Sequence, residues 1–289
     1  MTRRRSNLRW GVERRLEFIE FRLYWEGRMN RGDLINVFGV SVNQASTDLN
    51  RYLRLAPENM VYNKSARAYL RSSVFSPLFL KLDADRYLSE LRSVRSGVLS
   101  REDCWLHVHP TYDEVSNPSR KVSPETLRVV LEAIRESLAI EVQYQSLSTP
   151  SPRWRWIAPH AIGYDGFRWH ARSYCEEGLA FKDFLLGRII EVGAVRPSKS
   201  DPDEDLDWHE RVDLEIGPNP GLSESQQRVV QLDYGMQDGR AVLPVRKAFL
   251  FYALKRLGLE DAEAARDAHR QHIVLLNREL VERSLPGSA

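Results

Sequence analysis

The segment between residues 41 and 54 is rich in asparagine, glutamine, serine, threonine and arginine. Asparagine and glutamine recur there beside arginine, whereas an ordinary solvent-facing helix carries mainly glutamate and lysine. Asparagine and glutamine amides can pair bidentately with adenine, and a guanidinium can pair bidentately with guanine. The segment therefore predicts the chemistry of base recognition, carried by Ser41, Asn43, Gln44, Ser46, Thr47, Asn50, Arg51 and Arg54.

Three helices are predicted to position these side chains. Apolar residues at helical spacing indicate helices over 12–28 and 31–38, and a glycine ends the second. Ser41 and Gln44 have the spacing of a reciprocal capping box at the start of a third helix, which runs to Leu55. A tight turn before the last helix is typical of a helix-turn-helix, whose final helix enters the major groove of DNA.

A hairpin is expected directly after the third helix. Its strands lie over 60–62 and 67–70, and its polar, basic tip brings Lys64 and Arg67 near a phosphate backbone. Helices and hairpin together predict a winged helix-turn-helix domain over residues 1–75. The alternative is a three-helix protein-binding module that carries a hairpin.

The charge of the chain is divided unevenly along its length. Residues 1–72 hold fourteen Lys and Arg against seven Asp and Glu, whereas the rest of the chain holds 28 against 33. A basic end on a nearly neutral protein is the electrostatic footprint of a segment that meets polyanions. For Arg3, Arg4 and Arg5 alone, a solubilising tail is the simpler interpretation.

Length and composition exclude several classes of protein. A chain of 289 residues with 42% apolar and 28% charged residues is expected to fold as two domains, or three small ones. No apolar run approaches the roughly 18 residues of a membrane span, and no signal segment opens the sequence, so we expect a cytoplasmic protein. Two cysteines cannot form a disulfide framework.

No metal or other cofactor is expected. Cys104, His107 and His109 lie close together in the sequence but lack an evident fourth ligand. The acidic run that begins at Asp201 has leucine and valine where an EF-hand loop needs glycine and glutamate, so it indicates an acidic, solvated linker.

Several short strands are expected after a helix over 123–137. Apolar and polar residues alternate over 140–144, 153–157, 167–174 and 181–186, which favours a small, strongly bent sheet or barrel. In the third of these strands, the period of two places four polar side chains together on one face, namely Arg168, His170, Arg172 and Tyr174.

A set of short motifs lies between residues 159 and 189. In order they are Pro159, Gly163-Tyr164, Gly166, Arg168-Trp169-His170-Ala171 and Phe184-Leu-Leu-Gly-Arg188-Ile189. This order resembles the WYL domain over residues 123–196. The sequence departs from the family pattern twice, because the Trp-Tyr-Leu triplet reads Trp-His-Ala and Gly187 stands where the family usually has Asp.

With its basic helical end and its C-terminal extension, the whole chain resembles WYL-type bacterial transcriptional regulators, and more narrowly the BrxR/CapW repressors found beside anti-phage defence operons. The resemblance implies an α+β, multidomain fold with a central SH3/Sm-like small β-barrel. It also implies a homodimer held by the C-terminal module, and an effector that is a nucleotide, a nucleic-acid fragment or another anion. The parts expected after the winged helix are a connector over 76–122, the WYL ligand-sensing domain over 123–196, the acidic linker over 197–210 and a small α+β dimerisation module over 211–289.

The residues themselves also favour an anion site. Hydroxyl, imidazole and guanidinium groups suit phosphate, which arginine binds bidentately. Structural roles are the alternative for each residue, since His160 can be a hydrogen-bonded core histidine and Arg188 can pair with Glu191 or Asp183. The candidate ligand-binding residues are Tyr144, Ser146, His160, His170, Arg172, Tyr174 and Arg188.

The leading hypothesis is a ligand-responsive, sequence-specific repressor that binds an inverted repeat in double-stranded DNA as a homodimer and controls an anti-phage defence operon. An activator would share this architecture. The second hypothesis is an enzyme that processes nucleic acid or nucleotides in the WYL-like pocket. The chain has no Gly-x-x-x-x-Gly-Lys, Gly-x-Gly-x-x-Gly, His-Glu-x-x-His or Gly-x-Ser-x-Gly motif, so we expect no enzyme and assign no catalytic residue.

Overall fold

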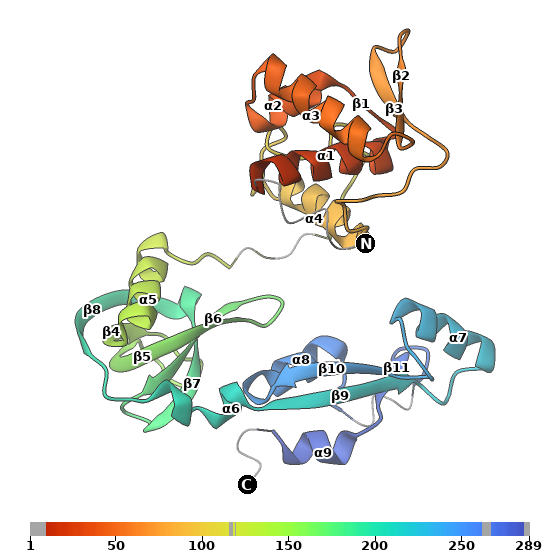
Figure 1. Cartoon of the computed structure of the whole chain (residues 1–289). Coiled ribbons are helices and arrows are strands. Elements are labelled where there is room, and N and C mark those ends of the chain that lie inside the picture. The colour runs from red at the N-terminus through yellow and green to blue at the C-terminus, as the bar shows by residue number, and fades with distance from the viewer. Residues whose placement is uncertain (1–9, 116–117, 119, 262–266, 286–289) are drawn as a thin grey trace. The chain divides into compact units, whose positions relative to one another are not determined.

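The computed structural model describes residues 10–115, 118, 120–261 and 267–285. The chain divides into two compact units, residues 1–116 and 117–289 (Figure 1). Among the described residues, the first unit has one buried apolar cluster and the second has two. Within the described ranges, no helix is both long and apolar enough to cross a membrane.

The first unit is a helical domain with a small sheet. Helix α1 (Trp10–Glu26) leads through β1 (Arg28–Met29) to α2 (Arg31–Phe38) and α3 (Val42–Leu55), and the hairpin β2 (Met60–Asn63) and β3 (Ala68–Arg71) follows. Strand β3 lies between β1 and β2, and both pairings are antiparallel. The order of elements expected from the sequence for a winged helix-turn-helix is confirmed.

The capping of α2 and α3 differs from the expectation. At α3, Ser41 Oγ accepts the Gln44 backbone N–H at 3.2 Å, but among the described residues the Gln44 side-chain oxygen does not accept the Ser41 N–H in return. The Gln44 Nε2 donates to Asp48 at 3.0 Å. Asp48 is a fully buried carboxylate, so the bond that it accepts from the Gln44 amide is charge-assisted and fixes that side chain. A complete capping box forms one helix earlier, between Asn30 and Asp33.

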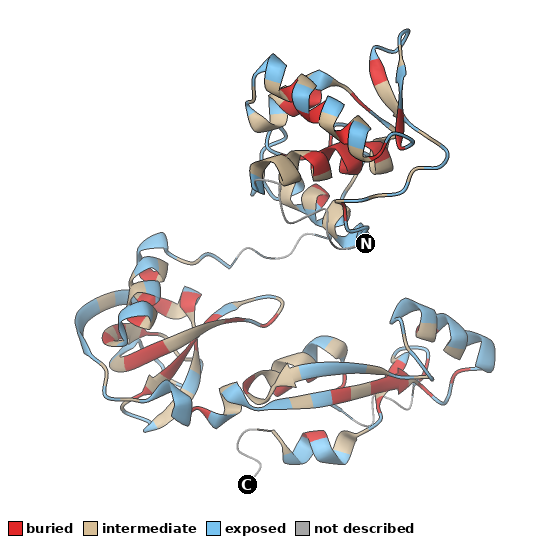
Figure 2. Ribbon diagram, viewed as in Figure 1, coloured by how far each residue is buried: buried red, intermediate tan, exposed pale blue. Residues whose placement is uncertain are grey.

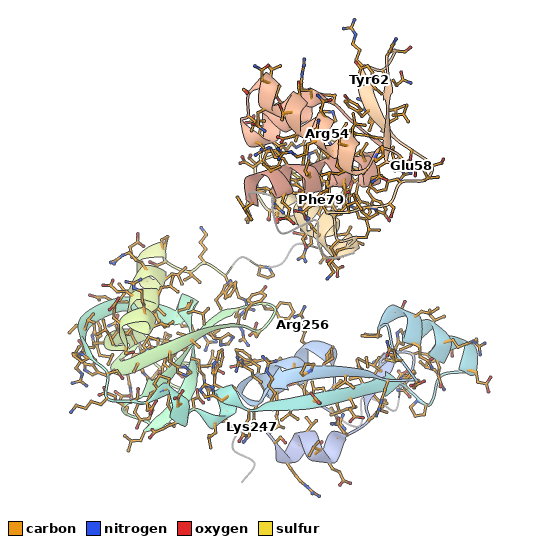
Figure 3. The ribbon with its side chains drawn as sticks, in the orientation of Figure 1. Arg54, Glu58, Tyr62, Phe79, Lys247 and Arg256 are labelled. Carbon is orange, nitrogen blue, oxygen red and sulfur yellow. The ribbon has the colours of Figure 1, made fainter. Side chains whose placement is uncertain are left out.

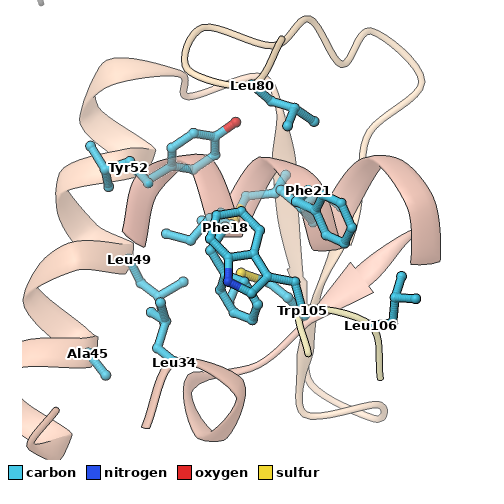
Figure 4. Packing of buried hydrophobic residues seen from close by; sticks show 14 of the residues in the cluster. Phe18, Phe21, Leu34, Ala45, Leu49, Tyr52, Leu80, Trp105 and Leu106 are labelled. Atoms are coloured by element: carbon cyan, nitrogen blue, oxygen red, sulfur yellow. The ribbon is translucent and has the colours of Figure 1, made fainter. Parts of the chain in front are cut away.

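The segment expected to be a connector, residues 76–122, contributes to the core of the first unit. After α4 (Ala84–Arg95) the chain returns Trp105 against Phe18 and Phe21, with ring centroids 5.3 and 5.5 Å apart (Figure 4). Leu80, Leu91 and Leu106 are buried in the same cluster. The difference arises because isolated apolar residues in a stretch of weak periodicity show no helical or strand pattern, although a core can still bury them.

A buried carboxylate holds the start of this segment in place. Glu20 of α1 has no exposed surface and accepts the backbone N–H groups of residues 78, 79 and 80 at 2.6–2.7 Å, and the Tyr52 hydroxyl donates to it at 3.1 Å. Burial raises the pKa of Glu20, while these hydrogen bonds act to lower it. The inner face of α1 is accordingly among the most buried surfaces of the unit (Figure 2).

The second unit begins with a helix on a bent antiparallel sheet. Helix α5 (Pro124–Glu136) starts at the cap Ser123 with proline in its first turn. It packs on strands β4 (Leu138–Tyr144), β5 (Arg153–Tyr164) and β8 (Ile189–Pro197). Strands β6 (Trp169–Cys175) and β7 (Ala180–Leu185) complete the order β7-β6-β5-β4-β8, and the short helix η1 (Leu186–Arg188) joins β7 to β8.

A second α+β module follows in the same unit. Its sheet has the order β10-β9-β11, formed by Arg211–Pro218 (β9), Ala241–Arg246 (β10) and Ile273–Leu275 (β11). Helices α7 (Glu224–Asp233), α8 (Leu250–Leu257) and α9 (Arg278–Arg283) accompany it, with the short turn η3 (Lys247–Phe249) before α8. Between the two sheets, the expected acidic linker forms the short helices η2 (Pro202–Glu204) and α6 (Leu206–His209). The expected α+β, multidomain fold class is confirmed.

Candidate nucleic-acid interface and anion site

Helix α3 presents the predicted base-reading face to solvent. Asn43, Thr47, Asn50 and Arg54 are exposed, and Arg51 is half-buried (Figure 3 labels Arg54). Among the described residues, the side chains of Asn43, Asn50, Arg51 and Arg54 have no hydrogen bond or ion pair, so their donors and acceptors remain available to an external partner.

Other members of the predicted set already have internal partners. Ser41 caps the helix, and the Gln44 amide is bound to Asp48. The Ser46 and Thr47 hydroxyls donate to backbone carbonyls one turn earlier at 2.9 and 2.8 Å, although each oxygen can still accept a bond. These four residues therefore have less capacity for outside contacts than the four that are unengaged.

A groove of about 540 Å³ lies between α3 and the hairpin. Asn50 and Ser46 line it from the helix, and Arg67 and Tyr62 line it from the hairpin; Lys64 is exposed in the turn between β2 and β3. The groove contains two arginines and no carboxylate, which suits a polyanion.

Sequence reasoning missed two residues of this groove. Arg31, the first residue of α2, donates to the Ser46 hydroxyl at 3.3 Å, and Tyr62 packs its ring 5.1 Å from that of Tyr69. Position at the start of the second helix could have indicated Arg31, because that helix end lies beside the recognition helix in this motif. Tyr62 lay within the expected hairpin but was not considered as a contact residue.

In the second unit, Arg172 is the centre of a buried ion-pair cluster. It lies on β6, is 5% exposed, and donates from Nε and Nη2 to the two carboxylate oxygens of Asp205 at 2.7 and 2.8 Å. Its Nη1 donates to Asp183 on β7 at 3.2 Å. This is the bidentate geometry by which arginine binds carboxylate or phosphate.

A β-bulge brings His160 to the same carboxylate. The register between β5 and β6 shifts between Pro159 and Ala161, so His160 is the extra residue opposite Arg172. Its Nε2 lies 2.9 Å from Asp205 Oδ2, and its ring packs edge-on against Phe181. Two candidate residues from different strands therefore meet at one acceptor.

The charge states of this cluster follow from its surroundings. Burial alone would raise the pKa of Asp205, but the hydrogen bond and charge of Arg172 and the bond from His160 hold the pKa below its ordinary value. Burial lowers the pKa of His160, against the effect of Asp205, so the ring is neutral at pH 7 and donates its Nε2 proton. Burial raises the pKa of Asp183, against the charge of Arg172.

His170 belongs to a second cluster. Its Nε2 lies 3.0 Å from Asp165 Oδ2, which also accepts from Arg168 Nε at 2.7 Å. Burial by itself would raise the pKa of Asp165, but these two hydrogen bonds and two from backbone amides lower it well below its usual value. The His170 ring packs 4.9 Å from that of Tyr252 on α8, so this cluster joins the sheet to the C-terminal module.

The other candidates are dispersed. Tyr174 lines a cavity of about 410 Å³ beside Arg196 and Lys199. Tyr144 is buried in the core, where its hydroxyl accepts the Leu185 N–H at 3.2 Å, and Ser146 lies in the loop after β4, paired with Ser148. Arg188 is half-buried in η1 and, among the described residues, pairs with neither Glu191 nor Asp183.

Sequence reasoning also missed the carboxylates that organise these clusters. Asp205 is 2% exposed, although it lies in the run interpreted as a solvated linker. Asp165 follows Tyr164 at the hairpin between β5 and β6. No local signal distinguishes Asp205 from its exposed neighbours, because its partners Arg172 and His160 lie 33 and 45 residues away. The partners of Asp165 are local, since Arg168 and His170 follow it within five residues, but its spacing to them was not considered.

Comparison with protein families gives three matches that follow the order of the modules. Residues 11–93 match the winged helix-turn-helix domain of the BrxR transcriptional regulator, and residues 125–193 match the WYL domain. Residues 211–281 match the C-terminal dimerization domain of the BrxR transcriptional regulator. No enzyme family is among these matches.

Similar whole proteins carry one name. A DNA-binding transcriptional repressor CapW from Stenotrophomonas maltophilia is 41% identical over 96% of this chain and 93% of its own length. Repressors of that name from Pseudomonas aeruginosa and Escherichia coli are 37% and 35% identical over 96% and 95% of this chain, and over 93% and 92% of their own lengths. A solved structure, proteasome accessory factor B/C of Arthrobacter aurescens, matches 94% of this chain and 47% of its own at 13% identity and a TM-score of 0.24, which supports no argument.

Proposed function

The chain belongs to the CapW family of DNA-binding transcriptional repressors, and from this premise we propose that it represses transcription by binding an inverted repeat in double-stranded DNA as a homodimer. The observation that supports this proposal most directly is the face of α3, where Asn50, Arg51 and Arg54 have no side-chain partner within the described part of the chain and Asn50 lines a basic groove. Two such helices in a dimer would read half-sites about 34 Å apart, one turn of DNA, or a multiple of that distance.

Response to an effector is the second part of the proposal. The WYL sheet carries a guanidinium and an imidazole that converge on one carboxylate. A cavity of about 410 Å³ is lined by Tyr174 on the same strand as the guanidinium and by Glu204, the chain neighbour of that carboxylate's residue. Groups that hold an internal carboxylate can also hold an effector's phosphate, which favours a nucleotide, a nucleic-acid fragment or another anion. We place the protein in the cytoplasm and propose an anti-phage defence operon as its target.

A mobility-shift assay tests the DNA-binding proposal. Purified full-length protein is titrated with EDTA present onto the DNA upstream of its own gene and onto scrambled DNA of equal length. We expect selective binding that weakens as salt rises, because phosphate contacts release counterions. Equal weak binding to both probes would contradict sequence-specific repression, and DNA cleavage that requires a divalent metal would favour the enzyme hypothesis.

Replacing Arg51 with alanine is expected to weaken binding to the specific DNA by about 10- to 100-fold, since a base-contacting arginine contributes about 1–3 kcal/mol of discrimination. The loss should be smaller on scrambled DNA. Competition binding at fixed salt measures the affinity of the variant for the specific DNA and for the scrambled DNA. Arg92→Ala is the matched control, because Arg92 is an exposed arginine of α4 in the same unit. If Arg51→Ala and Arg92→Ala bind the specific DNA equally well, α3 is not the recognition helix.

A further inference from the structure

Asp205 fills the position that an anionic effector would need. Its two oxygens accept from Arg172 Nε and Nη2, and the imidazole of His160 donates to one of them, so three donors from the WYL sheet converge on one carboxylate. The side chain is 2% exposed. Asp205 comes from the segment between the two sheets, not from the WYL sheet itself.

With Asp205 in place, the cluster has no net positive charge to attract an anion. Asp205 alone neutralises Arg172. Asp183 lies 3.2 Å from Nη1 and Asp207 lies 4.0 Å from Nη2, while His160 is neutral. An incoming phosphate would meet a guanidinium whose three nitrogens are already paired, in surroundings that disfavour additional negative charge.

We propose that Asp205 is an internal competitor for the effector, so that a phosphate- or carboxylate-bearing molecule binds Arg172 and His160 by displacing it. The inference rests on the proposed response to an effector and adds its mechanism. Because a tethered group competes at a millimolar or higher effective concentration, a singly charged anion would compete poorly. The site therefore selects a multiply charged oxyanion. A cavity of about 410 Å³ is lined by Tyr174, two residues along β6 from Arg172, and by Glu204, the chain neighbour of Asp205, and offers room for the rest of the molecule.

Displacement of Asp205 would be transmitted to the C-terminal module. Asp205 is the N-cap of α6, where its Oδ1 accepts the Trp208 N–H at 3.3 Å. The Trp208 ring packs against His160 and against Phe249 of η3, and Arg246 stacks over it at 4.5 Å. Strand β9, the centre of the C-terminal sheet, begins two residues after α6.

Lys247 holds the other end of the same segment. Its Nζ lies 3.2 Å from Asp207 and 3.3 Å from Glu210 (Figure 3 labels Lys247). The segment from Asp205 to Glu210 therefore has one anchor on the WYL sheet and one on the C-terminal module. An effector that releases Asp205 changes how the WYL sheet and the C-terminal module are connected. Such an effector binds one arrangement of these two parts more tightly than the other, as a switch requires.

Anion rescue of an Asp205 variant tests the inference. Thermal unfolding of the full chain is followed with inorganic pyrophosphate from zero to 10 mM, balanced with chloride at constant ionic strength. In Asp205→Ala we expect a saturable rise of about 5 °C in the unfolding midpoint, because pyrophosphate replaces the missing carboxylate on Arg172. In the wild type and in Asp203→Ala, the unfolding midpoint should rise by less than half as much. Asp203→Ala is the control because it loses an exposed charge from the same segment.

Two further variants complete the design. Asp205→Asn keeps the shape of the side chain and should give the same rescue if the alanine variant does not fold. Adding Arg172→Gln to either variant should abolish the rescue. Equal rises in Asp205→Ala, Asp205→Asn and Asp203→Ala, or a rescue that survives Arg172→Gln, would overturn the inference.

The wild type gives an independent measurement that does not require a variant to fold. The Trp208 amide bonds both the carboxylate and the backbone carbonyl of Asp205, and the His209 amide bonds that carbonyl. Displacing the carboxylate removes the cap of this turn, so hydrogen exchange at both amides should accelerate at saturating pyrophosphate. Unchanged exchange there would overturn displacement. Neither assay contains DNA, so the two proposals can fail separately. Specific DNA binding without anion rescue would support the repressor and overturn this inference. Anion rescue without specific DNA binding would support this inference and contradict the proposed repressor.

Discussion

Replacing Arg172 with alanine is expected to lower the free energy of unfolding of the second unit by about 3–5 kcal/mol, because removal of one partner leaves buried charge uncompensated. Arg172 is the partner of both Asp205 and Asp183, and all three side chains are at most 10% exposed. Urea unfolding of the full chain at pH 7, with exchange of the β6 amides as a local readout, measures the loss.

The pH dependence of that loss has a definite sign. In the wild type, the lowered pKa of Asp205 gives a stability contribution that is present above the unfolded pKa of about 3.9 and is lost as the pH falls through the folded pKa. Without the guanidinium, burial raises the pKa of the carboxylates, so the variant gains relative stability as the pH falls. The difference between the two proteins should be largest near pH 7 and shrink towards pH 4.

Arg196→Ala is the control for this variant. Arg196 pairs with Glu176 and stacks on Trp156, but it is about half exposed, so its ion pair contributes at most about 1 kcal/mol. If Arg172→Ala costs no more than Arg196→Ala, or if its cost does not change with pH, the Arg172 cluster is not the buried, mutually dependent arrangement described above.

Replacing Trp105 with alanine is expected to destabilise the first unit by about 3–5 kcal/mol, the range for truncating a buried aromatic residue. The indole is 6% exposed and packs edge-on against Phe18 and Phe21. The guanidinium groups of Arg14 and Arg86 lie 4.0 and 4.3 Å from its ring centre. The cavity left behind would face the helix that supports α3, so specific DNA binding should weaken at temperatures where the variant begins to unfold.

Val98→Ala is the control, because it truncates an apolar side chain that lies in the same segment as Trp105 but is not buried. Val98 lies in the same segment but is 83% exposed, so its truncation should change the free energy of unfolding by less than about 0.5 kcal/mol. The free energy of unfolding of both variants is measured by urea unfolding, with hydrogen exchange at the α1 amides as a local readout. Similar small losses would mean that the segment over 76–122 is a connector, as the sequence predicted, and not part of the first unit's core.

Local patterns were sufficient for the elements and for much of the DNA-facing surface. The amphipathic period over 41–55 and the capping serine predicted α3, and four of its predicted residues have side chains without a partner among the residues that the structure describes. The period of two predicted that Arg168, His170, Arg172 and Tyr174 share one face; Arg168 precedes β6, and within the strand the alternate residues Ala171 and Cys175 lie in the core. These predictions succeed because helix and strand periods are set by the backbone geometry of neighbouring residues.

Tertiary structure alone decided which of these side chains are buried with internal partners and which remain open to an external ligand. Asp205 meets Arg172 across 33 residues and His160 across 45, and Trp105 reaches α1 from more than 80 residues away. In the sequence, Asp205 is one aspartate in an acidic run and Trp105 one aromatic residue in an irregular stretch. Their burial depends on which distant surfaces the fold brings against them, and contacts between residues so far apart leave no periodic trace in the local sequence.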